Sequence, residues 1–63
     1  MDIRLSDPAY QVDLVVFLRN SGIFAVERIG GETVRVFEVE DERLRQVLAA
    51  WEGVHPGIRA ELT

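Results

Sequence analysis

The side chains of this sequence that are best suited to binding a ligand are arginines. All seven basic residues of the 63-residue chain are arginine, and Arg4, Arg35 and Arg59 fall where we expect three neighbouring strands to expose them on one face of a sheet. A guanidinium group binds a carboxylate or phosphate through two parallel hydrogen bonds, so such a row could hold a small anionic ligand. We favour the alternative that these arginines form cross-strand ion pairs with acids of the same face.

Side chains suited to catalysis are scarce. The chain has no cysteine, which excludes thiol catalysis, thiolate metal sites and a redox role, and it has no lysine, which excludes Schiff-base chemistry. The few hydroxyl groups show no spacing typical of a Ser/His/Asp triad, and no phosphate-binding loop is present. We therefore expect a protein that is not an enzyme and that binds no cofactor.

Metal binding also has little support in the sequence. His55 is the only histidine, and without a cysteine or a second histidine to share a metal we expect its ring to cap a turn or to pack against Trp51. The carboxylates at 38 and 40–42 could attract a hard cation. Because the macrodipole also favours carboxylates at a helix N-terminus, we expect capping there and no metal site.

The charge of the chain limits its partners. The formal net charge is −4, whereas surfaces that bind nucleic acid are normally basic. Phe37 beside arginines is similar to the base-stacking aromatics of RNA-recognition sheets, but the first strand supplies no aromatic, so we expect no nucleic-acid partner. The longest apolar run, residues 14–18, is far too short to cross a bilayer, and the N-terminus has no signal-peptide features. We expect a cytoplasmic protein that does not interact with membranes.

Four short segments have the composition of β-strands. Alternating or β-rich patterns predict strands at 2–5, 23–29, 33–39 and 58–62. Gly30 and Gly31 are expected to provide positive φ for the tight turn between the middle two strands. The inward-facing parity of those two strands is ambiguous, because residues 23, 25 and 29 and residues 24 and 26 both form apolar sets. The inward set that we choose is Phe24, Val26, Val34 and Val36.

Two amphipathic helices separate the outer strands from this hairpin. The first is predicted from Pro8 to about Asn20, with Asp7 as its N-cap, Ser6 as the alternative cap and Gly22 as the residue that stops it. The second follows the acids at 40–42 and ends at Gly53. The core-facing stripes are predicted to be Tyr10, Leu14, Phe17 and Leu18 in the first helix and Leu44, Val47, Leu48 and Trp51 in the second.

The element order βαββαβ predicts one α+β domain over residues 1–63. We expect a ferredoxin-like two-layer sandwich, with a four-stranded antiparallel sheet in the order 4-1-3-2 and both helices on one face. A core of this size gives marginal stability, and the second face of the sheet stays uncovered. We therefore expect a homodimer or a complex with another protein. The expected interaction face is either the open face of the sheet, with Arg4, Arg35, Phe37 and Arg59, or the surplus apolar stripe of the first helix, with Val12 and Val16.

Four motifs are spread over most of the chain: Leu5-Ser6-Asp7-Pro8, Phe17-Leu18-Arg19-x-x-Gly22, Glu32-Thr33-Val34-x-Val36 and Trp51-x-x-x-His55-Pro56-Gly57. In these motifs the chain resembles a group of small uncharacterised bacterial proteins, which implies a fold but no activity, since the motifs are mainly cap, core and turn residues. More distantly, the topology is similar to that of ACT-type regulatory domains, which implies a small effector bound between paired domains. The glycine-containing loop that follows their first strand is replaced here by Ser6-Asp7-Pro8.

Overall fold

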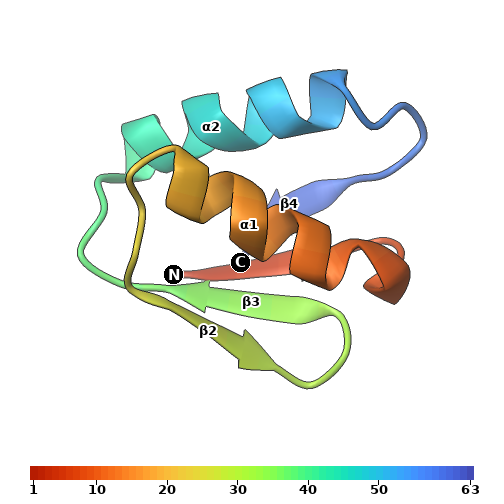
Figure 1. Cartoon of the computed structure of the whole chain (residues 1–63), viewed down its shortest axis with the longest axis horizontal. Coiled ribbons are helices and arrows are strands. Elements are labelled where there is room, and N and C mark those ends of the chain that lie inside the picture. The colour runs from red at the N-terminus through yellow and green to blue at the C-terminus, as the bar shows by residue number, and fades with distance from the viewer.

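The computed structural model describes all 63 residues and contains four strands and two α-helices (Figure 1). The elements in chain order are β1 (Asp2–Leu5), the 3-10 turn η1 (Pro8–Tyr10), α1 (Gln11–Asn20), β2 (Val26–Ile29), β3 (Thr33–Val36), α2 (Asp41–Gly53) and β4 (Ala60–Leu62). The α+β class and the element order are those that the sequence predicts.

The four strands form one antiparallel sheet with β1 and β3 at its centre. The spatial order is β2-β3-β1-β4, which reads 4-1-3-2 from the opposite edge. Strand β1 pairs with both β3 and β4, so β2 and β4 are the edge strands. Together with the two helices, this sheet is compatible with a ferredoxin-like sandwich.

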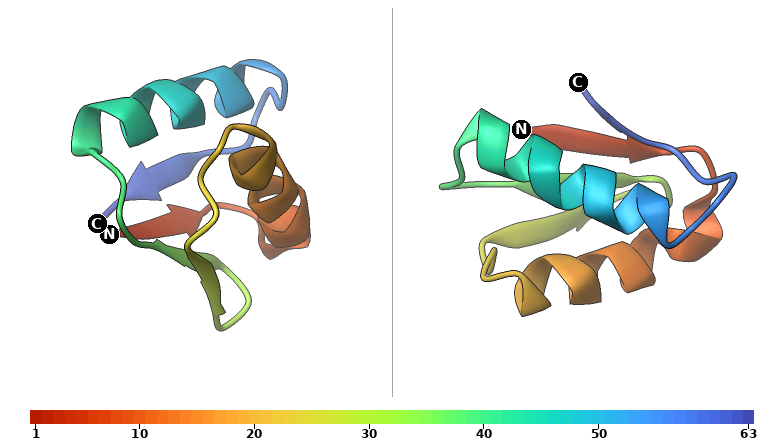
Figure 2. Two further views of the ribbon diagram at one scale, coloured as in Figure 1. Left: turned by 60° about the vertical axis from the view of Figure 1, so that its left-hand side comes forward. Right: turned by 90° about the horizontal axis from the view of Figure 1, so that it is seen from above.

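The core lies between the helices and one face of the sheet. Ile3 of β1 is opposite Val34 of β3 and Leu62 of β4, and alternate residues of each strand turn toward the helices. Helices α1 and α2 lie side by side on that face (Figure 2), and both contribute to a single apolar cluster. Its twelve buried residues are Ile3, Leu5, Leu14, Val15, Leu18, Ile23, Val34, Val36, Leu44, Leu48, Trp51 and Ala60.

Helix α1 begins later than predicted. Asp7 is the cap, as expected, because its side chain accepts a hydrogen bond from the Ala9 amide at 3.0 Å. The first turn is a 3-10 turn, however, and the α-helix starts at Gln11. Gly22 follows the helix with a φ of 89°, and this left-handed conformation ends it as predicted.

The buried face of α1 also differs from the predicted stripe. The buried residues of α1 are Gln11, Leu14, Val15 and Leu18. Tyr10 and Phe17, which the predicted stripe included, are only partly buried. In α2 the predicted stripe is confirmed for Leu44, Leu48 and Trp51, and Val47 is partly buried.

The predicted inward position of Phe24 is wrong. The Ile23 amide donates to the Leu18 carbonyl at 2.9 Å, which holds residues 23–25 in the connection after α1, and β2 begins only at Val26. The strand alternation therefore does not extend back to Phe24, which is 73% exposed, while Ile23 is buried. The rest of the predicted inward set contributes to the core, namely Val26, Val34 and Val36.

Two further elements are shorter than predicted, and one glycine behaves differently. Strand β3 ends at Val36 rather than at 39, and β4 begins at Ala60 rather than at 58. Glu38, in the connection after β3, has a φ of 56°, a left-handed conformation that cannot continue a strand. In the turn between β2 and β3, Gly30 has a positive φ of 64°, whereas Gly31 does not, so the prediction is wrong for Gly31.

Gln11 is the one polar residue buried in the core, at 4% exposed. Its Nε2 donates hydrogen bonds to the carbonyls of Gly30, at 3.0 Å, and Thr33, at 2.8 Å. Because these carbonyls flank the turn between β2 and β3, the side chain ties the start of α1 to the hairpin.

We expect Gln11→Ala to lower the free energy of unfolding by about 1–3 kcal/mol, because two backbone carbonyls lose their donor in a place with little water. Gln46→Ala is the matched control, since Gln46 is exposed on α2, and it should change the free energy by less than about 0.5 kcal/mol. Urea denaturation followed by circular dichroism measures both variants. Equal effects of the two substitutions would contradict the anchoring role of Gln11.

Candidate functional site

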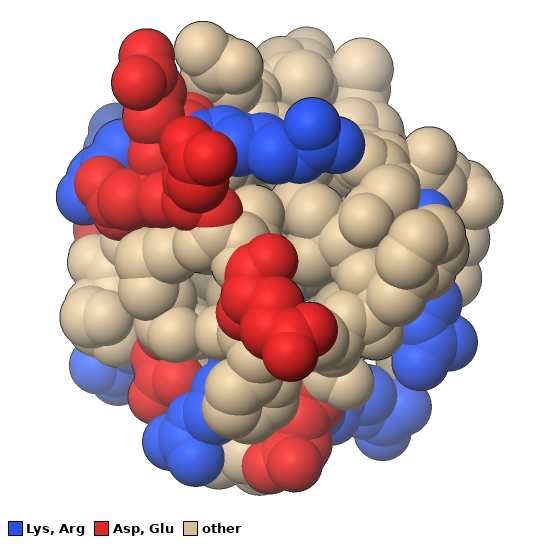
Figure 3. Space-filling model, turned by 90° about the vertical axis from the view of Figure 1, so that its left-hand side faces the viewer, with Lys and Arg blue, Asp and Glu red and all other residues tan.

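A hollow of about 290 Å³ lies at one end of the molecule, where the connection from α1 to β2 meets the connection from β3 to α2. Phe24, Phe37 and Val39 line it, and Phe37 is 45% exposed. Figure 3 views this end of the molecule and shows acidic side chains amid uncharged surface. We call this feature the end hollow; both apolar and charged residues line it, and Phe24 and Phe37 are among those that the fold leaves in contact with water.

The charged residues that line the end hollow differ in the contacts they make within the protein. Glu38 and Glu40 line it and take part in none of the ion pairs of the structure. Arg43 lines it as well, but its Nη2 donates to the Ser21 carbonyl at 2.7 Å, which ties α2 to the connection after α1. The two carboxylates are therefore free to meet a cation.

The outer face of α1 carries exposed apolar side chains too. Val12 and Val16 lie one turn apart and are 55% and 50% exposed. Arg19 follows about one turn later, is exposed and has no ion-pair partner. We call Val12, Val16 and Arg19 the outer stripe of α1. Val54, 66% exposed, directly follows α2 and lies outside both features.

A polar cluster around Trp51 joins the two helices. The Nε1 of the buried Trp51 donates to Oδ2 of Asp13 at 3.1 Å, and the same oxygen lies 2.6 Å from Nε2 of His55. The His55 ring stacks on the indole with centroids 4.4 Å apart, and Tyr10 meets both rings edge-on. The expected packing of His55 against Trp51 is confirmed.

These contacts leave the His55 ring no free nitrogen. Its Nδ1 lies 2.9 Å from the Trp51 carbonyl, and its Nε2 faces the Asp13 carboxylate. Both partners lie within the protein, so both ring nitrogens are engaged by the fold. A general base needs an unprotonated nitrogen directed at its substrate. The arrangement therefore suits a clamp between α1 and the end of α2 better than a catalytic pair.

We expect Asp13→Ala to lower the free energy of unfolding by about 1–3 kcal/mol, because the indole N–H of buried Trp51 loses its acceptor. His55→Ala and the double variant complete a double-mutant cycle in which the two effects should not add. Denaturation followed by the fluorescence of Trp51, the only tryptophan, measures all three. Strictly additive effects would show that Asp13 and His55 do not act together.

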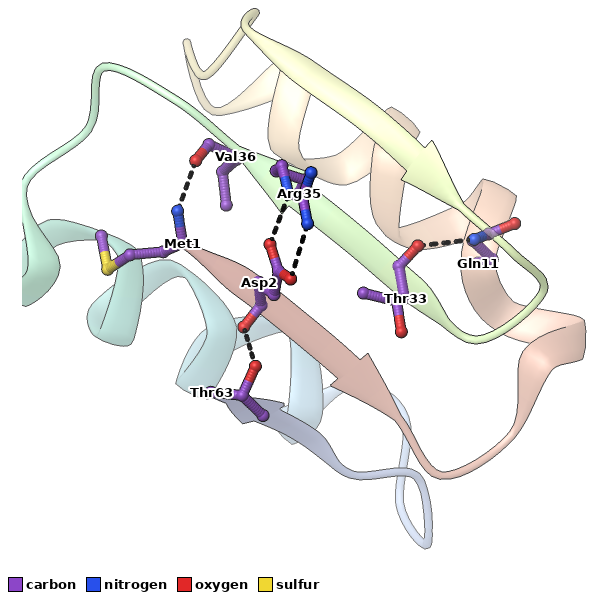
Figure 4. A network of polar contacts seen from close by, with 7 residues as sticks. All are labelled: Met1, Asp2, Gln11, Thr33, Arg35, Val36 and Thr63. Carbon is purple, nitrogen blue, oxygen red and sulfur yellow. Dashed lines mark hydrogen bonds and ion pairs between the residues drawn. The ribbon is translucent and has the colours of Figure 1, made fainter.

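Ion pairs cross the open face of the sheet. Arg35 of β3 lies between Asp2 of β1 and Glu27 of β2. Its Nε and Nη2 donate to the two Asp2 carboxylate oxygens at 2.8 and 3.2 Å (Figure 4). These hydrogen bonds hold the pKa of Asp2 below its usual range and raise the pKa of Arg35. Cross-strand ion pairing is thus confirmed for Arg35.

The other two arginines of the open face do not extend this pair into a row of cations. Arg4 lies opposite Glu61 and makes an exposed ion pair with Glu32 at 3.5 Å, a contact worth about 0–1 kcal/mol. Arg59 has no ion pair. Arg4, Arg59 and Glu61 line a hollow of about 150 Å³. Because carboxylates alternate with the guanidinium groups, this face presents mixed charge.

The lowered pKa of Asp2 makes the contribution of this pair dependent on pH. A depressed pKa in the folded state means that the stabilisation is complete above the unfolded pKa, about 3.9, and is lost as the pH falls through the folded pKa. We expect Arg35→Gln to raise the pKa of Asp2, and the difference in unfolding free energy between wild type and variant to vanish in strong acid. Carboxyl NMR titration and acid-dependent denaturation measure these effects. An unchanged Asp2 pKa in the variant would contradict the pairing.

The six residues expected to form an interaction face lie in three separate places in the structure. Arg4, Arg35 and Arg59 lie on or beside the open face, Val12 and Val16 on the outer stripe of α1, and Phe37 in the end hollow. Sequence reasoning missed Phe24 as a surface residue. The sequence contained one signal for this exposure. Phe24 comes two residues after Gly22, which ends the helix, and a chain that leaves a helix does not have to enter a strand at once.

No group of three or more histidine, cysteine or carboxylate side chains is placed to hold a metal ion. Neither helix is long and apolar enough to cross a membrane. No protein-family model matches the chain, and no match was found among curated proteins or solved structures.

Proposed function

We propose that this protein is a non-catalytic interaction module that associates with a second copy of itself through apolar side chains its fold leaves exposed. The observation that carries the proposal is the exposure of Phe24, 73%, in a chain whose core contains only twelve buried apolar residues. Burying an aromatic side chain stabilises by about 1.5–3 kcal/mol. A domain of this size gains appreciably from such a contact, because its own core is small.

The exposed apolar side chains are numerous as well as large. Four of them are at least half exposed, namely Val12, Val16, Phe24 and Val54. Single apolar residues on a surface are ordinary, whereas grouped ones mark interaction sites. Two groups exist here: the end hollow, where Phe24 lies with Phe37, and the outer stripe of α1.

The polar side chains support a non-catalytic role. Both nitrogens of His55 face acceptors within the protein, and Arg35 is engaged by Asp2. The end hollow is lined by apolar residues, glycine, glutamates and one arginine, with no hydroxyl or imidazole group. Anion binding at the open face has less support, because Glu61 lies opposite Arg4.

The edges of the sheet are poor surfaces for association. Residues Glu27 and Arg28 place charge on both faces of edge strand β2, and charged edges discourage pairing between sheets. On the other edge, the Ala60 amide of β4 already donates to Oε2 of Glu52 at 2.8 Å. The apolar groups on the helix side and at the end of the molecule are therefore the better interfaces.

We expect the wild-type protein to sediment as a self-associating species at micromolar concentration, and Phe24→Asp and Val16→Asp to shift it toward monomer. Both residues are exposed, so the variants should stay folded, which circular dichroism checks; Val and Asp also have similar helix propensities.

Val54→Asp is the matched control. It places the same charge on a valine that is more exposed than Val16 and lies outside both apolar groups, and its sedimentation should equal that of the wild type. A wild-type protein that remains monomeric at every concentration, unaltered by any of the three substitutions, would remove self-association as the function.

A further inference from the structure

We propose that the outer stripe of α1 from a second copy of this chain binds in the end hollow, with Arg19 of that copy facing Glu38 and Glu40. This inference rests on the self-association proposed above, and it names the two surfaces that meet. In each such contact, one surface of a copy meets a different surface of the other copy.

The exposed apolar residues that line the end hollow favour an occupant with apolar side chains. Phe24 and Phe37 are both exposed and both line this hollow of about 290 Å³. The rings come from two different connections, one after α1 and one after β3. A ligand that enters the space between these connections removes both rings from water, which is the dominant gain in protein association.

The carboxylates that line the end hollow favour an occupant that also carries a cation. Glu38 and Glu40 have no ion-pair partner, whereas Arg43 already donates to the Ser21 carbonyl. The positive end of the α2 dipole lies beside Glu40 and offsets part of the negative charge. Two unpaired carboxylates nevertheless remain at the rim, and they favour a partner that carries a guanidinium or ammonium group next to its apolar surface.

The outer stripe of α1 has this chemistry. Residues 12, 16 and 19 are spaced i, i+4 and i+7, which places them on one side of the helix. Helices that bind in apolar grooves present anchors at this spacing. Val12 and Val16 are at least half exposed and Arg19 is unpaired, so nothing in the monomer competes for the stripe.

The positions of the two surfaces favour a closed pair of copies. The stripe ends at Arg19, and the lining of the end hollow begins three residues later at Gly22, so both lie near the C-terminal end of α1. A stable interface buries roughly 800 Å² per partner, while this chain exposes 3974 Å² in all. A single stripe in a single hollow covers a handful of side chains. A two-fold pair forms the contact twice, with the stripe of each copy in the hollow of the other.

The test is a mixing experiment with two variants that each damage one surface. Val16→Asp damages the outer stripe of α1 and leaves the end hollow intact. Phe24→Asp damages the end hollow and leaves the outer stripe intact. Alone, each variant should associate at least about tenfold more weakly than the wild type, since every contact then includes a damaged surface. Mixed in equal amounts, they should form a heterodimer through the one intact contact. Sedimentation of the mixture, with one variant carrying a fluorescent label, measures it.

Each outcome bears on a different part of the proposal. Weakened single variants whose mixture associates support the contact between the outer stripe and the end hollow. Weakened single variants whose mixture stays monomeric overturn it, because like surfaces then meet like surfaces. If the wild type self-associates and neither substitution weakens its association, the contact between the outer stripe and the end hollow is overturned. The proposed function stands in that case. A monomeric wild type removes both.

Charge reversal provides a second readout at the rim. Arg19→Glu alone and Glu38→Arg alone should each weaken association roughly two- to fivefold, the range that exposed ion pairs give. The double variant, which exchanges the two charges within one chain, should bind more tightly than either single variant, because positions 19 and 38 again carry opposite signs, and less tightly than the wild type, because Glu40 now repels the acid at position 19. A double variant weaker than either single variant would overturn the placement of Arg19 beside Glu38.

Discussion

The rest of this structure depends on one constraint, which is that the sheet buries apolar side chains on only one of its two faces. Both helices lie on the same face of a four-stranded sheet, and every buried apolar residue belongs to the one cluster between them. None of the remaining segments forms a layer on the other face of the sheet. Any apolar side chain that does not fit beneath α1 and α2 must therefore stay in contact with water or find a partner outside the chain.

The same constraint explains how the polar side chains are used. The sheet face that no helix covers is polar, and its one well-formed bidentate contact, between Arg35 and Asp2, joins its two central strands. On the covered side, polar groups occur where two elements must be fixed to each other. Gln11 fixes α1 to the hairpin, and Asp13 fixes α1 to Trp51 and His55. These groups fix the elements of the fold to one another.

The parts of the fold that the sequence predicts are those set by local periodicity. Alternation places Ile3, Val34 and Val36 inward, and helical spacing places Leu44, Leu48 and Trp51 in the core. Phe24 could not be placed in this way, since the hydrogen bond from Ile23 to Leu18 interrupts the alternation before β2 begins. The contact between Asp13 and Trp51 joins residues 38 positions apart, and no pattern within one helix specifies such a pairing. The end hollow is equally invisible in the sequence, because two connections distant along the chain form it.

Surplus apolar surface distinguishes this molecule from a domain that merely folds. Exposing Phe24 does nothing for a monomer, which would be as stable and less prone to aggregate with a polar residue there. The connection that holds Phe24 lies against the connection that holds Phe37, and Arg43 links the first of these to α2 through the Ser21 carbonyl. A side chain held open by a fixed backbone is preorganised, so a partner that binds it does not have to order the surface first. Preorganised apolar surface beside unpaired charge is what the proposed self-association would use, and it is the physical reason for testing that proposal first.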